Sequence, residues 1–360
     1  MRSSAAQLAL VLVAVGACSR TPEAQPDTAS PKARPSTSSV TSPAPAAAAS
    51  AARAPSVGTY QLPLSGSRLV AIGDIHGDLA ALRGALRLAG AIDSDDRWIG
   101  RGLTVVQTGD QVDRGDQDRE VLDLIEALEA AARAAGGAFY VLNGNHELMN
   151  ARLDFRYVTR KSFASFDELS SRAGALRGRL PEPELGRAAA FMPGAPYAQK
   201  LSRRLTVAKV GDSLFAHAGV LPVHVEYGLD RINREASAFL AGKTRDLPPM
   251  LGDEDGPVWT RRYGGTPVDD ANCELLGRVL EEVGAKRLIV GHTVQERGIS
   301  SACQERVFRI DIGLSAFYGA KPPQVLEVTT AGARVLDAGA ASAGGPKKGK
   351  ARDSALHSAP

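Results

Sequence analysis

The sequence predicts an α/β fold, because short apolar strands alternate with longer segments of helical periodicity. Three strand-like runs in the first half are apolar and bounded by glycine or polar residues, as in strands covered on both faces. They span residues 68–73, 103–109 and 138–144. Helical spacing follows the first two runs, over residues 79–88 and about 118–135. This order implies right-handed crossovers between parallel strands.

The second half of the chain predicts further strands and one insertion. Two runs flank Gly211-Asp212 and predict a hairpin. Later strands are predicted at 287–290, 307–312, 324–329 and 334–336. The stretch from about 150 to 200 is polar, rich in arginine and contains four prolines, which predicts a mostly helical insertion. The domain as a whole is expected to span 58–337.

The formal net charge of +3 over 360 residues is unevenly distributed. Residues 1–57 and 338–360 each carry +3, and subtracting both from the total leaves −3 for residues 58–337. Nucleic-acid-binding domains carry clustered positive charge. The charge pattern therefore argues against a basic nucleic-acid-binding core.

The first 18 residues are predicted to be a secretion signal. Arg2 precedes an apolar run over 8–15, which is too short to span a bilayer. The sequence Val-Gly-Ala-Cys ending at Cys18 resembles the lipobox of bacterial lipoproteins, which implies a lipid tether on that cysteine. Ordinary secretion with cleavage nearby is the alternative. The expected location is the periplasm or cell envelope, with Ser19 favouring the outer membrane.

Both ends are expected to be disordered. Residues 19–57 consist mainly of Ala, Ser, Thr and Pro, and residues 338–360 of Gly, Ala, Ser and Lys. Neither stretch has enough apolar bulk to offset the entropy of ordering. Cys273 and Cys303 are the remaining cysteines. In an oxidising compartment they could form a disulfide, or they could be two buried thiols, and the sequence leaves both open.

Polar motifs occur where the predicted strands end. Three strands end in glycine followed by Asp or Asn: GDIHG at 73–77, GDQVDRG at 109–115 and GNHE at 144–147. Two later loops are centred on histidine: AHAG at 216–219 and GHT at 291–293. Four of the six histidines lie in these loops. Since ligands of open α/β sheets bind at the carboxyl ends of strands, the five loops are expected to form one site.

The side chains in these loops predict a metal centre. Mixed Asp, Asn and His ligands suit Mn, Fe or Zn better than Ca or Mg, which prefer oxygen ligands. The donors outnumber those that one tetrahedral ion needs, so two divalent ions sharing a carboxylate are expected. Paired ions clamp a phosphoryl group and activate water. The chemistry therefore predicts phosphoester hydrolysis.

The ordered motif set resembles the calcineurin-like metallophosphoesterases, and VDRG and GNHE resemble their phosphoprotein phosphatase branch. GNHELMN at 144–150, RYVT at 156–159 and VWTR at 258–261 are similar to the bacterial-type Shewanella-like protein phosphatases. The resemblance implies a central β-sandwich flanked by helices on both sides, a four-layer αββα arrangement. It also implies two ion sites that share Asp110. One comprises Asp74, His76 and Asp110, and the other Asp110, Asn145, His217 and His292.

The resemblance also assigns roles around the ions. His146 would be the general acid, and Asp113 would hold its second ring nitrogen, as expected for an acid that must keep one tautomer. Two arginines, Arg114 and Arg261, would bind the phosphate oxygens, a task suited to the guanidinium fork. Asn145 would assist them.

Three nearby residues are open to other interpretations. Arg262 adjoins Arg261, and spacing does not choose between them. Asp78 is interpreted as a helix N-cap and Glu147 as a brace for its loop, rather than as ligands.

The resulting hypothesis is an exported dinuclear phosphatase that hydrolyses phosphomonoesters of phosphoproteins, with phosphotyrosine favoured, by direct attack of a metal-bound hydroxide. One alternative is a dinucleoside tetraphosphate or nucleotide hydrolase, against which the export signal argues. Another is an inactive secreted metal- or phosphate-binding module, against which the full ligand set argues.

Overall fold

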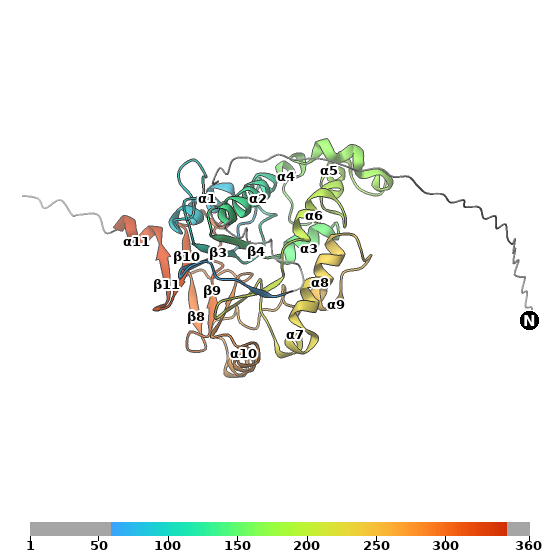
Figure 1. Cartoon of the computed structure of the whole chain (residues 1–360). Coiled ribbons are helices and arrows are strands. Elements are labelled where there is room, and N and C mark those ends of the chain that lie inside the picture. The colour runs from blue at the N-terminus through green and yellow to red at the C-terminus, as the bar shows by residue number, and fades with distance from the viewer. Residues whose placement is uncertain (1–58, 344–360) are drawn as a thin grey trace, which may run out of the picture. The chain divides into compact units, whose positions relative to one another are not determined.

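Two β-sheets pack face to face in the computed structural model, which describes residues 59–343 (Figure 1). The five-stranded sheet has the order β11 (Gly332–Asp337), β10 (Gln324–Thr329), β2 (Leu69–Ile72), β3 (Thr104–Gln107) and β4 (Ala138–Val141). The six-stranded sheet has the order β1 (Gln61–Leu62), β5 (Val207–Val210), β6 (Ser213–Ala216), β7 (Arg287–Val290), β9 (Val307–Arg309) and β8 (Ser300–Ala302).

The strand pairings confirm most of the predicted topology. Strands β2, β3 and β4 are parallel neighbours, as are β6, β7 and β9. The predicted hairpin is the antiparallel pair β5–β6, in which Val207 lies opposite Ala216. Strand β10 pairs antiparallel with both β2 and β11, so the five-stranded sheet is mixed, and the β5–β6 pair makes the six-stranded sheet mixed as well. The short strands β1 and β8 were not predicted.

Side-chain alternation along the strands produces the four layers. In β2, Leu69 and Ala71 face the other sheet, whereas Val70 and Ile72 pack against helices. Each fully buried aliphatic side chain contributes roughly 1.5–3 kcal/mol to stability. A slip by one residue would exchange both sets, so burial on both faces fixes the register.

Helices cover the outer face of each sheet. On the five-stranded sheet these are α1 (Leu79–Leu88) and α2 (Asp118–Ala134). On the six-stranded sheet they include α7 (Pro222–Tyr227), α8 (Leu229–Leu240), α9 (Pro249–Gly252) and α10 (Asp270–Val283). The β-sandwich between helical layers that the sequence implied is therefore confirmed.

The predicted insertion is mostly helical. After α3 (Asn145–Ala151) come α4 (Arg160–Ala164), the 3₁₀ segment η1 (Asp167–Leu176), α5 (Glu182–Phe191) and α6 (Pro196–Leu201). Phe166 meets Phe191 and Tyr197 edge to face, with ring centroids 5.3 and 5.1 Å away. All three rings belong to the buried cluster that contains residues of the six-stranded sheet, so α5 and α6 pack on the main core.

The two ends of the chain differ in what the structure describes. The predicted signal, lipobox and linker lie outside the described residues and stay predictions. At the other end, the prediction of an unstructured tail from 338 is wrong for its first residues, which form α11 (Ala338–Ala343). Alanine favours helix, and the Asp337 carboxylate accepts a hydrogen bond from Gly339 N at 2.7 Å, which caps the helix start.

Two further observations bear on the predictions for the cysteines and for membrane attachment. A disulfide joins Cys273 on α10 to Cys303 after β8, so of the two open alternatives the structure has the bridge. Within residues 59–343, none of the helices has the length and apolarity needed to cross a bilayer.

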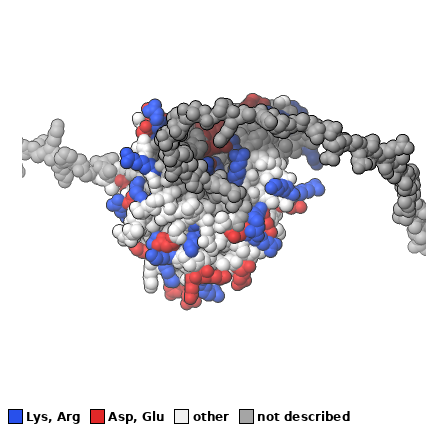
Figure 2. Space-filling model, in the orientation of Figure 1, with Lys and Arg blue, Asp and Glu red and all other residues white. Residues whose placement is uncertain are grey.

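Charged side chains of both signs are interspersed on the visible part of the face in Figure 2. Acidic side chains gather at its lower edge, where α10 lies in Figure 1. A nucleic-acid backbone needs a continuous basic surface. The visible part of this face does not offer one.

Candidate active site

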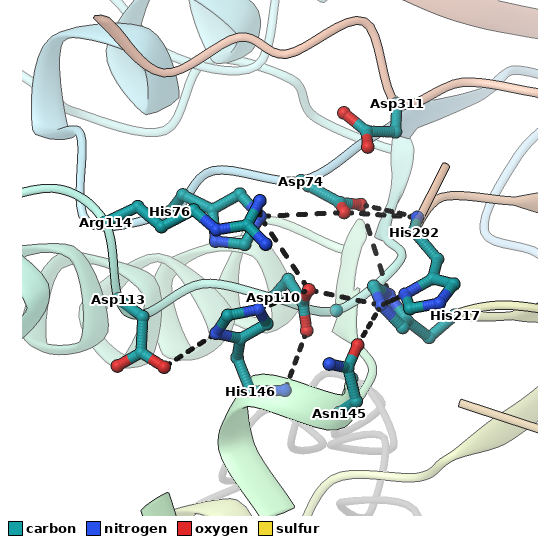
Figure 3. A network of polar contacts seen from close by, with 12 residues as sticks. Asp74, His76, Asp110, Asp113, Arg114, Asn145, His146, His217, His292 and Asp311 are labelled. Atoms are coloured by element: carbon teal, nitrogen blue, oxygen red, sulfur yellow. Dashed lines mark hydrogen bonds and ion pairs between the residues drawn. The ribbon is translucent and has the colours of Figure 1, made fainter. Parts of the chain in front are cut away.

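The five motif loops meet at one edge of the two sheets (Figure 3). They follow β2, β3 and β4 of one sheet and β6 and β7 of the other. Parallel strands present their carboxyl ends on the same side, and the packing of the two sheets brings both sets of ends together. All six predicted ligands lie here, and five of them are at most 3% exposed: Asp74, His76, Asp110, Asn145 and His217. His292, the sixth, is half-buried.

One half of the site is centred on His217. Its Nε2 lies 2.8 Å from Asn145 Oδ1, 3.2 Å from Asp110 Oδ2 and 3.1 Å from His292 Nδ1. Its Nδ1 donates to the carbonyl of Thr108 at 3.0 Å, and a carbonyl can only accept. In the neutral ring, Nε2 therefore carries a lone pair that converges with those of its neighbours. Such an arrangement calls for a cation between them.

The other half is centred on His76. Its Nδ1 donates to Val112 O at 3.1 Å, which leaves Nε2 facing the site, 3.9 Å from Asp74 Oδ2 and 3.8 Å from Asp110 Oδ2. Asp110 thus faces both histidine groups, the position that a bridging ligand occupies. His76, Asp110 and His146 form one cluster of possible metal ligands, and Asp110, His217 and His292 form another.

The state of the imidazoles fits metal binding. Burial lowers the pKa of His76 to about 3 and that of His292 to about 2, so both rings are neutral near pH 7. A neutral imidazole is the form that binds a metal. With its Nδ1 lone pair directed at the site, the neutral His292 ring carries its proton on Nε2, which is buried without a hydrogen-bond partner in the described residues and could donate to a bound oxygen.

Several carboxyl groups are buried close together at the site, and burial and mutual repulsion oppose the ionisation of Asp74 and Asp311. Burial, with Asp311 and Asp110 adding to it, raises the pKa of Asp74 well above its usual range. Burial also raises the pKa of Asp311 to about 6. For Asp110, burial opposes ionisation, but His217 and His146 outweigh it and hold its pKa well below the usual range. Divalent cations would neutralise this cluster, so the donor set fits the metal centre that the sequence predicted.

Glycines allow the loops to approach each other closely. A Cβ added to Gly144 would lie 2.2 Å from Asp110 Oδ1, and one added to Gly291 would lie 2.2 Å from Asp74 Oδ1. A Cβ contact below 3 Å is not tolerated without movement. These two glycines therefore make room for the ligand carboxylates.

The backbone of the site is strained. Five of its residues have positive φ, between 48° and 71°: His76, Asp110, Asp113, Arg114 and His292. Such conformations cost on the order of 1–3 kcal/mol each and persist only where surrounding contacts enforce them. Glu147 supplies part of that enforcement, because its carboxylate accepts from the backbone N–H groups of Asp110 (2.9 Å), Gln111 (2.8 Å) and Gly144 (2.6 Å).

The structure confirms the interpretations of two residues that were not expected to be metal ligands. Glu147 is a brace for its loop, as the contacts above show. Asp78 is the N-cap of α1, with its side chain accepting from Ala81 N at 2.9 Å.

His146 and Asp113 form a buried pair. His146 Nδ1 donates to Asp113 Oδ2 at 2.6 Å, and its Nε2 faces the site, 3.7 Å from Asp110 Oδ2. Burial alone would lower the pKa of His146, but Asp110 and Asp113 outweigh it and raise that pKa. The two carboxylates therefore stabilise the protonated ring more than water stabilises a free imidazolium, and its second proton would sit on the nitrogen that faces the site.

The two predicted phosphate-binding arginines both lie at the rim. Arg114 Nη1 is 3.3 Å from His76 Nε2, and Arg261 Nη1 donates to Thr293 Oγ1 at 3.2 Å, next to His292. Arg262 instead pairs with Asp255 through Nε at 2.9 Å and Nη2 at 2.5 Å. Because Arg262 is already committed to a carboxylate, the geometry favours Arg261 for a phosphate.

Four buried polar residues next to the site were not predicted. They are Asp311, Asp118, Asn150 and Arg187. Asn150 had a usable signal, since it follows His146 by one helical turn within GNHELMN. Asp118 is the first residue of α2, where an acidic residue is common and does not by itself indicate a site. Arg187 carries no motif, and only the fold places it here.

Buried Asp, His and Asn donors at the strand ends of a helix-flanked β-sandwich define a metal-dependent phosphoesterase. Comparison with known proteins is consistent with this class. The calcineurin-like phosphoesterase family matches residues 67–296, and the chain belongs to that family.

Relatives within the family narrow this to a metal-dependent phosphatase of the Shewanella-like branch. The chain is 38% identical to Shewanella-like protein phosphatase 2 of Arabidopsis thaliana over 292 residues, covering 72% of this chain and 75% of the relative. It is 28% identical over 271 residues to Shewanella-like protein phosphatase 1 of Plasmodium berghei, covering 72% and 71%. Among solved structures, a cold-active protein-tyrosine phosphatase of a psychrophilic Shewanella species matches with a TM-score of 0.61 at 26% identity, covering 77% and 82%.

Proposed function

We propose that this phosphatase hydrolyses phosphomonoesters of phosphoproteins, with phosphotyrosine preferred, and that it works with two divalent ions of Mn, Fe or Zn. Asp74, His76 and Asp110 would hold one ion, and Asp110, Asn145, His217 and His292 the other. When bound, the ions supply an activated water as nucleophile and offset the charge of the phosphoryl oxygens.

The protein's own side chains bind the phosphate and supply a proton. Arg114 and Arg261 would clamp the phosphate oxygens, assisted by the Asn145 amide. His146 would protonate the leaving oxygen from Nε2 as the bond to phosphorus breaks. Asp113 keeps the other ring proton on Nδ1, which sets the direction of the ring and stabilises its charge.

The preference for phosphotyrosine is supported by an aromatic collar around Arg114, formed by Tyr157 and by Phe317 and Tyr318 of η2 (Ala316–Tyr318). The Arg114 guanidinium carbon lies 5.2, 5.8 and 5.3 Å from the centroids of these three rings. Tyr157 and Phe317 are 43% and 63% exposed. Exposed rings beside a phosphate-binding arginine could pack against a phenyl ring, which phosphoserine lacks. A similar solved structure is that of a protein-tyrosine phosphatase.

We expect Tyr157→Ala and Phe317→Ala each to lower kcat/KM for a phosphotyrosine peptide by about fivefold. An aromatic pair contributes roughly 0.5–1.5 kcal/mol. The matched phosphoserine peptide should change by less than about twofold. Val335→Ala removes an apolar side chain of β11 whose exposure of 42% is close to that of Tyr157, and it should alter neither rate.

Other outcomes of the same panel would contradict the proposal. Equal losses on both peptides would mean that the collar does not select the phenyl ring. Faster turnover of a dinucleoside tetraphosphate than of the phosphotyrosine peptide would favour the nucleotide-hydrolase alternative.

We further propose that the enzyme acts at the cell envelope, tethered by lipid on Cys18. Support comes from the sequence alone, since this residue lies outside the described range. In a bacterial host that processes lipoproteins, Cys18→Ser should move the phosphatase activity from the membrane fraction to the soluble fraction. An unchanged distribution would contradict the tether.

A further inference from the structure

We propose that Arg187, on helix α5 of the insertion, is a positioning residue for the general acid and acts on it through Asp113. This inference rests on the proposed role of His146. Arg187 lies 74 residues along the chain from Asp113 and belongs to none of the motif loops. In this role, a residue of the insertion would help to orient the group that transfers the proton.

Arg187 is 0% exposed, and each of its guanidinium nitrogens has a polar partner. Nη2 lies 2.8 Å from Asp113 Oδ1 and 2.7 Å from Asp118 Oδ2. Nε donates to Asn150 Oδ1 at 2.6 Å, and Nη1 donates to Ser162 Oγ at 2.8 Å. A planar group bonded on all sides in this way has a single orientation.

The two carboxylate oxygens of Asp113 have separate partners. Oδ2 accepts from the Nδ1 of His146 at 2.6 Å. Oδ1 accepts from Arg187 at 2.8 Å and from Asn150 Nδ2 at 2.9 Å. Because a carboxylate is rigid and planar, holding Oδ1 sets the direction of Oδ2. That direction in turn aims the imidazole at the leaving oxygen.

The insertion fixes the position of Arg187 itself. A Cβ added to Gly186 would lie 2.3 Å from the carbonyl oxygen of Phe166, so glycine is what allows α5 to pack this closely. The guanidinium carbon of Arg187 lies 5.5 and 4.9 Å from the rings of Phe166 and Phe191. Ser162, which bonds Arg187, lies on α4 of the same insertion.

A purely structural role is the competing explanation. Asp113 and Asp118 are both fully buried, and Arg187 compensates their charge. Removal of Arg187 should lower stability under either explanation. Only a positioning role predicts that the loss of rate depends on how much the leaving group needs a proton.

The test compares phenyl phosphate, whose leaving group needs protonation, with 2,4-dinitrophenyl phosphate, whose leaving group does not. For Arg187→Lys and Arg187→Met, we expect kcat on phenyl phosphate to fall by about tenfold or more, since general acids contribute roughly 10²–10⁴-fold. On the dinitrophenyl ester, kcat should fall by less than about threefold. If the Met variant does not fold, the Lys variant carries the test.

Arg204→Met is the matched control. Arg204 is also buried, at 4% exposure, and bonds Gln111 Oε1 at 3.0 Å and Glu129 at 3.5 Å, away from the acid pair. In Arg204→Met, kcat on phenyl phosphate and kcat on the dinitrophenyl ester should change by the same factor, if they change at all. Equal losses in the Arg187 variants, while His146→Asn remains sensitive to the leaving group, would overturn this inference alone. Equal losses in His146→Asn would overturn the acid assignment and this inference with it.

Discussion

Replacing His146 by asparagine is expected to lower kcat on a phosphotyrosine peptide by about 10²-fold or more and to leave the bound metal unchanged. The amide cannot deliver a proton as an imidazolium does, so the leaving oxygen departs unprotonated. Nδ1 of His146 is held by Asp113 at 2.6 Å, and the ring is not among the six predicted ligands. Turnover by steady-state kinetics, with elemental analysis of the same preparations, measures both effects.

The metal content of the His146→Asn variant distinguishes a general acid from a metal ligand. His146 also lies in a cluster of possible metal ligands with His76 and Asp110, so loss of an ion from the variant would identify it as a ligand. His224→Asn serves as the control, because His224 is equally buried and bonds Leu221 N at 3.0 Å, outside the site. Full activity in the His146 variant would show that another group protonates the leaving oxygen.

The residues of the site that could be predicted from the sequence are those that directly follow a strand. Asp74, Asp110 and Asn145 each follow a buried strand and a glycine, and parallel strands bring such positions together without further information. The pairing of His146 with Asp113 came from the resemblance, and the structure places the two side chains in contact. These residues lie within loops whose spacing the strands determine.

Residues that only long-range packing brings to the site could not be predicted from the sequence in this way. Arg187 reaches Asp113 only because α5 packs against the segment around Phe166, and no local pattern in the insertion indicates that contact. The choice between Arg261 and Arg262 depended on Asp255, a neighbour in space rather than in a motif. Strands β1 and β8 have two and three residues, too few to show a period.

Replacing Asp110 by asparagine is expected to remove bound metal and to lower kcat by about 10³-fold or more. The substitution keeps the shape but removes the charge shared by both halves of the site. Asp110 Oδ2 lies 3.2 Å from His217 Nε2 and 3.8 Å from His76 Nε2, so this carboxylate faces the predicted ligands of both ions. A contribution of several kcal/mol from the ions corresponds to a rate factor of this size.

Thermal unfolding gives a readout that does not depend on turnover. A metal that binds only the folded protein stabilises it by about 2.7 kcal/mol at a hundredfold excess over Kd. The native protein should therefore show a higher Tm with added Mn than with a chelator, whereas Asp110→Asn should show the same Tm in both. Asp113→Asn changes another buried aspartate of the same loop that is no predicted ligand, so it should lose activity yet keep the metal-dependent shift.

An Asp110 variant that retained two ions would mean that the bridging ligand is misassigned. The shared-carboxylate arrangement, and with it the division of the six ligands into two sets, would then be wrong.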